Sequence, residues 1–66
     1  MTTETYEMFS VEVGDTIIIA GSMYAVASIE PDDNGYILRL TDEEGYAKMI
    51  SAGEFDKVRV VVPDID

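Results

Sequence analysis

The sequence predicts an all-β fold in which five short strands follow one another as a meander and curl into a small barrel. Apolar residues alternate with polar ones or form short β-branched runs, a pattern typical of strands. Turn residues, mainly Gly, Pro, Asp and Asn, interrupt these runs at short intervals. The 66 residues suffice for one small domain. Together these features favour a small barrel with short connections.

Each predicted strand is bounded by residues that favour turns. Gly14-Asp15 precedes the first strand, Gly21-Ser22 separates the first two, and Pro31 ends the second because it has no backbone donor. The strands are expected at residues 16–20, 23–30, 36–41, 46–50 and 57–62. Residues 51–56 suit a single 3-10 turn before the last strand. The chain is therefore expected to have an N-terminal arm (1–10), a barrel (11–62) and a C-terminal tail (63–66).

Alternation along the strands predicts which side chains fill the core. Tyr24 and Val26 are in phase, whereas Ile29 is out of phase with them, so a bulge near Ala27-Ser28 is expected to turn all three inward. The predicted core consists of Ile17, Ile19, Val26, Ile29, Leu38, Leu40, Met49, Val58 and Val60.

The same alternation places some apolar side chains on the outward face of the barrel. We call these the outward apolar patch, which consists of Ile18, Ile37 and Val61 rimmed by Arg39 and Arg59. Such residues are covered by the N-terminal segment 6–9, are scattered exposed side chains, or form one contact surface, and only a contiguous group is informative.

Two segments resemble a known barrel class. Residues 11–17 (VEVGDTI) and 24–29 (YAVASI) follow a layout that recurs in KOW-type and translation-factor-type domains of the SH3-like class. The resemblance implies a five-stranded SH3-like barrel, an architecture that is also common in small phage-encoded proteins of unknown role. KOW-type domains carry a basic loop that faces RNA or the ribosome. The corresponding tip here, Ala20-Gly21-Ser22, has no basic residue.

Composition excludes several classes of function. With no Cys and no His, the chain cannot form a zinc, haem or iron–sulfur site that needs thiolate or imidazole, and it has no His to activate a serine nucleophile. The net charge of -10 opposes binding to nucleic acid or to anionic membranes. Most carboxylates fall in turns, where water keeps them ionised, so we expect no catalytic residues, no cofactor and no enzyme. The acidic start, without a basic segment followed by an apolar one, predicts a cytoplasmic protein.

The stretch PDDNGY (31–36) invites comparison with a calcium-binding loop. If Gly35 is aligned with the glycine of the EF-hand template, Glu30, Asp32 and Asn34 occupy the early ligand positions. The closing bidentate Glu would then fall at Thr41, and strands rather than helices flank the loop. We therefore expect no metal site here, and Asn34-Gly35 favours a hairpin turn.

In a meander, alternate turns lie at the same end of the barrel. The acidic residues expected to gather at one end are Asp15, Glu30, Asp32, Asp33, Glu54 and Asp56. Such an end attracts a basic partner, although turns also tolerate acids without any function.

The favoured hypothesis is a non-enzymatic acidic protein-binding module, namely a phage-encoded accessory factor that acts on a host or phage protein. Its contact surface is either the acidic end or the outward apolar patch. One alternative is a DNA mimic that inhibits a nucleic-acid-binding enzyme, since phage proteins of that kind are similar to this chain in charge. Another is a structural subunit that assembles with copies of itself.

Overall fold

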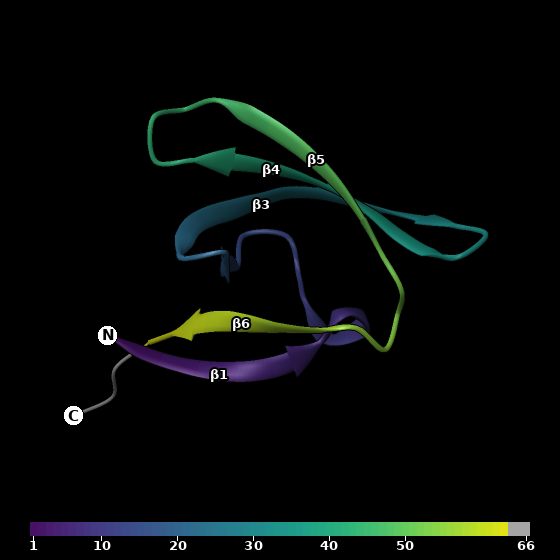
Figure 1. The fold of residues 1–66 in the computed structure, drawn as a ribbon, viewed down its shortest axis with the longest axis horizontal. Coiled ribbons are helices and arrows are strands. Elements are labelled where there is room, and N and C mark those ends of the chain that lie inside the picture. Colours follow the sequence, from purple (N-terminus) through teal and green to yellow (C-terminus); the bar gives the residue numbers. More distant parts are fainter. Residues whose placement is uncertain (64–66) are drawn as a thin grey trace.

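The computed structural model describes residues 1–63, and they form one antiparallel sheet of six strands. Along the chain the elements are β1 (Thr2–Glu7), the 3-10 helix η1 (Met8–Ser10), β2 (Thr16–Ile19), β3 (Ser22–Asp32), β4 (Gly35–Asp42), β5 (Ala47–Ala52) and β6 (Lys57–Val62). The strand order is β1-β6-β2-β3-β4-β5. The sheet curls so that β3, β4 and β5 lie opposite β1 and β6 (Figure 1).

The predicted all-β class is confirmed, but the prediction of a five-stranded barrel is wrong. The sheet has a sixth strand, and within residues 1–63 its terminal strands β1 and β5 each pair with one neighbour only. The sheet is therefore open. Four of the five predicted strands have different bounds, and β6 has the bounds predicted.

The strand missed by the sequence prediction is β1, which lies in the expected N-terminal arm. Its sequence, TTETYE, has no apolar alternation, so it forms through its ladder with β6 rather than by its own pattern. Beyond that ladder, the Met8 amide donates to Asp56 O (2.7 Å) and the Phe9 amide to Glu54 O (3.1 Å). These bonds fix η1 against the segment that precedes β6.

Two local predictions also need correction. The 3-10 helix lies at Met8–Ser10, whereas residues 53–56 form a tight turn in which the Asp56 amide donates to Gly53 O at 3.1 Å. Strand β3 does not end at Pro31 but continues to Asp32. Because β2 pairs with β3 only as far as Ala25, Pro31 lies where that side of β3 is free, and a missing N–H is tolerated there.

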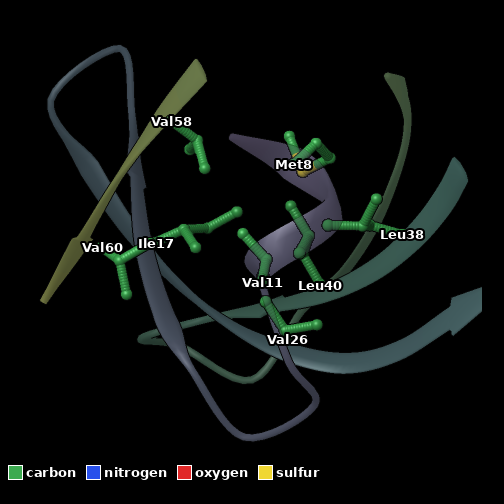
Figure 2. Packing of buried hydrophobic residues seen from close by; sticks show 8 residues of the cluster. All are labelled: Met8, Val11, Ile17, Val26, Leu38, Leu40, Val58 and Val60. Carbon is green, nitrogen blue, oxygen red and sulfur yellow. The ribbon is translucent and has the colours of Figure 1, made fainter. Parts of the chain in front are cut away.

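The core lies between the two sides of the curled sheet (Figure 2). Its buried residues are Met8, Val11, Ile17, Val26, Leu38, Leu40, Val58 and Val60. The predicted bulge is confirmed by a register shift between Val26 and Ser28. Predicted core residues Ile19 and Ile29 are partly buried against this cluster.

One core prediction is wrong, because Met49 is 61% exposed. Ile50 is the residue of β5 that pairs with the buried Leu38, and directly opposite side chains share a face. Met8 and Val11, which the sequence prediction did not place in the core, fill it from η1 and the residue that follows.

The tip of the β3–β4 hairpin packs closely against the end of β5. A Cβ added to Gly35 would collide with Ala52 O. It would also lie 2.7 Å from Gly53 Cα and 3.0 Å from Glu54 N. Gly35 also has φ +144°, a conformation that side chains rarely adopt. Glycine is therefore required here both for its conformation and for its lack of a side chain.

We expect Gly35→Ala to lower the free energy of unfolding by about 3 kcal/mol, from the collision and the backbone strain together. Gly21→Ala is the matched control, since Gly21 also has positive φ (+82°) but nothing within 4 Å of an added Cβ. It should cost only about 1 kcal/mol, the strain alone. Urea denaturation of both variants measures the difference, and equal losses would contradict the close approach.

Candidate functional site

The close approach at Gly35 brings two acidic segments together. A surface hollow is lined by residues 31–36 of the β3–β4 hairpin and by Glu54 from the turn before β6. Figure 1 shows this hairpin tip and the β5–β6 connection on the same side of the molecule, with η1 beside the connection. We call this region the hairpin end and define it as Glu30, Asp32, Asp33, Glu54 and Asp56. It contains five of the six acids that the sequence predicted would gather.

Two of these carboxylates stabilise the turns that carry them. Asp32 Oδ1 accepts a hydrogen bond from the Asn34 amide at 2.8 Å, and Asp56 Oδ2 accepts one from the Gly53 amide at 2.8 Å. Both are local contacts that favour turn conformations.

The other three carboxylates of the hairpin end have no such role. Glu30, Asp33 and Glu54 are exposed, and no donor among residues 1–63 bonds to their side chains. Their charge is available to a partner, whereas the charge of Asp32 and Asp56 is partly engaged.

The sixth predicted acid, Asp15, lies elsewhere. Its backbone carbonyl accepts from the Val26 amide, and its carboxylate accepts from the Glu12 amide at 2.9 Å. Asp32 is the sixth residue after Val26 in β3, which places it roughly 20 Å further along the strand. Asp15 therefore belongs to a different acidic group.

That second group surrounds Tyr6. Partial burial raises the pKa of the Tyr6 phenol above 10.0, and Glu4, which accepts its hydrogen bond, raises it further together with the charges of Asp15 and Glu12. Glu4 and Tyr6 pair with Val60 and Val58, whose side chains lie in the core, and directly opposite side chains share a face. Both therefore face the inside of the curled sheet from its edge strand β1.

The opposite end of the molecule has its own acidic turn. Asp42 Oδ1 accepts hydrogen bonds from the amides of Glu44 and Tyr46, both at 2.9 Å. A hollow there is lined by residues 21–24 and 42–44. Glu43 and Glu44 are exposed and provide a charge-matched comparison for the hairpin end.

The outward apolar patch does not form one surface. Ile18 pairs with Arg59 across β2 and β6, and Val61 lies two residues further along β6. Ile37 and Arg39 lie on β4, which is two strands from β2 and three from β6. Strand β3 lies between these two groups, where Met23 pairs with Ile18 and Glu30 pairs with Ile37. Met23 and Glu30 are seven residues apart, so the two groups are separated by roughly 20 Å along the strand direction. Ile18, Ile37 and Val61 are each half-buried, so the patch is two small groups.

Sequence reasoning missed an aromatic pair next to the hairpin end. Phe9 of η1 and Phe55 of the turn before β6 meet edge to face, with ring centroids 5.9 Å apart and planes at 80°. They are 51% and 69% exposed, respectively. Neither lies in a strand, so the period-two pattern gave no signal for them. A phenylalanine within a short acidic turn, as in Glu54-Phe55-Asp56, was the available clue.

Other kinds of site find no support in residues 1–63. No group of three or more metal-ligating side chains converges there. No polar or charged residue of that range is fully buried. In the same range, no helix has the length and apolar character needed to cross a membrane.

Compared with known proteins, the chain matches no family model, no curated protein and no solved structure. The resemblance to SH3-like barrels therefore stays a prediction.

The two kinds of acid at the hairpin end predict different responses to substitution. Asp56→Ala removes the acceptor for the Gly53 amide and should lower the free energy of unfolding by about 1 kcal/mol. Asp33→Ala removes an unengaged charge and should change it by no more than about 0.5 kcal/mol. Urea denaturation checks both, and an equal loss in the two variants would refute the division.

Tyr6 predicts a pH dependence of stability. Its raised pKa means that its contribution to stability is fully present below pH 10 and is lost as pH rises through the pKa of the folded state. Tyr6→Phe has no phenol to ionise, so the wild type should lose more stability than this variant between pH 9 and pH 12. Urea midpoints at each pH measure the difference, and a constant gap would show that Tyr6 titrates normally.

Proposed function

We propose that this protein is a non-enzymatic binding module that recognises a basic surface of another protein through its hairpin end. The observation that carries the proposal is the hollow where the β3–β4 hairpin meets Glu54, with Asp33 and Glu54 exposed at its rim. This junction requires Gly35, because a residue with a side chain would collide with the end of β5 and strain the backbone.

Electrostatics favours this kind of partner. The chain has 14 acids against 4 basic residues, and three unengaged carboxylates, Glu30, Asp33 and Glu54, lie at the hairpin end of a molecule 40 Å long. Charge concentrated in this way accelerates encounter with a cationic partner and disfavours anionic ones.

Self-assembly through the sheet edges is less favoured. Each edge strand directs a charged residue toward the inside of the curl: Glu4 on β1, opposite Val60, and Lys48 on β5, opposite Leu40. Inward-pointing charges on edge strands oppose pairing between copies. Lys48 Nζ instead lies 5.4 Å from the centroid of the Tyr24 ring, within cation–π range.

The proposal is tested by comparing two triple variants of equal charge. One neutralises the hairpin end (Glu30→Gln, Asp33→Asn, Glu54→Gln), and the other neutralises acids elsewhere (Glu12→Gln, Glu43→Gln, Glu44→Gln). Immobilised wild type and variants are incubated with lysate of the organism that encodes the protein, and bound proteins are identified by mass spectrometry. We expect a basic protein that wild type and control retain and the hairpin-end variant loses.

High salt should release the same protein, because exposed charge contacts are screened. If both triple variants lose it equally, net charge rather than the hairpin end determines binding, and the proposal is wrong. Displacement of the partner by duplex DNA would identify the module as a DNA mimic that uses the same carboxylates.

A further inference from the structure

The exposed aromatic pair lies on two segments that are joined by backbone hydrogen bonds beside the hairpin end. Hydrogen bonds from the Met8 and Phe9 amides to Asp56 O and Glu54 O tie the two backbones together on either side of Phe55. The rings meet edge to face, and half or more of each phenylalanine is exposed. A pre-ordered pair loses little conformational freedom when a ligand covers it.

The charges around the pair are mostly negative. Glu54 and Asp56 flank Phe55 in the turn, and Glu54 also lines the hollow of the hairpin end. The nearby cation is Lys57, which lines a second hollow with Phe9 and Glu7. Glu7 lies directly opposite Lys57 in the β1–β6 ladder, so these two charges offset each other. The surface of Phe9, Glu54, Phe55 and Asp56 is thus aromatic and anionic.

We infer that this surface binds an arginine-rich segment of the partner in preference to a lysine-rich one; the inference rests on the proposed function. A guanidinium stacks flat on an aromatic ring while its edge donates to a carboxylate, and both kinds of group lie side by side here. An ammonium is compact and strongly hydrated, so it gains less from the rings. The carboxylates attract any cation, and Phe9 and Phe55 select arginine.

Two other occupants of an exposed aromatic pair are disfavoured by charge. A second copy of the chain would bring its own net charge of -10 to the contact. An anionic lipid surface would meet Glu54 and Asp56 next to the rings.

The test uses two fluorescein-labelled peptides of equal charge, octa-arginine and octa-lysine, titrated with the full-length protein at 100 mM NaCl. Anisotropy should show wild type binding octa-arginine at least about fivefold more tightly. In Phe9→Leu/Phe55→Leu the ratio of affinities should fall to within about twofold. Phe55→Leu alone should lower it in part, and this turn residue is exposed enough to leave folding intact.

Tyr46→Leu is the matched control, because Tyr46 is as exposed as Phe55 (69%) but lies in the turn between β4 and β5. It should keep the wild-type ratio. A ratio unchanged by the phenylalanine variants, or lost equally in Tyr46→Leu, overturns the inference while leaving the proposed function standing. If the hairpin-end triple variant binds both peptides as tightly as wild type does, the proposed function fails as well.

Concentration-dependent dimerisation in sedimentation that Phe55→Leu abolishes would assign the pair to self-association, and binding to phosphatidylglycerol vesicles would assign it to a lipid surface. Either result overturns the inference.

Discussion

The close backbone approach at Gly35 is the contact on which the hairpin end depends. The hairpin of β3 and β4 reaches the end of β5 because Gly35 has no side chain. The turn at residues 53–56 follows β5 and leads directly into β6. The backbone amides of Met8 and Phe9 bond to this turn and so join η1 to it. The Met8 side chain lies in the core. Gly35 thus allows the acidic hairpin to meet the acidic turn, and the bonds from Met8 and Phe9 place the aromatic pair beside them.

The acidic residues of this chain serve two physical purposes. Asp15, Asp32, Asp42 and Asp56 each accept backbone amides within a turn, and they stabilise the connections of the sheet. Exposed acids such as Asp33 and Glu54 stabilise nothing in the fold and add repulsion. A small open sheet has little stability to spare, so acids that oppose compaction without a structural role are reasonable candidates for binding.

Sequence patterns predicted the parts of the fold that depend on local alternation. The bulge after Val26 and the inward faces of β4 and β6 follow from such patterns and are present, whereas the hairpin turn lies at residues 33–34, one residue before the predicted position, with Gly35 already in β4. Strand β1 could not be predicted, because TTETYE becomes a strand only through its pairing with β6. Met49 was misplaced because both Met49 and Ile50 are apolar, and only the β4–β5 register decides between them. The grouping of acids at the hairpin end followed from the meander, whereas Asp15 and the aromatic pair depend on tertiary contacts.

The proposed binding mode needs the hairpin tip, the turn before β6 and η1 to be held together in solution. A cross-peak between the α-protons of Gly35 and Gly53 in a nuclear Overhauser spectrum tests this most directly, because Gly53 Cα lies 2.7 Å from the position of a Cβ on Gly35. We expect a strong cross-peak in the free protein. Its absence, with the β3–β4 ladder intact, would mean that the two acidic segments do not meet and would contradict the account.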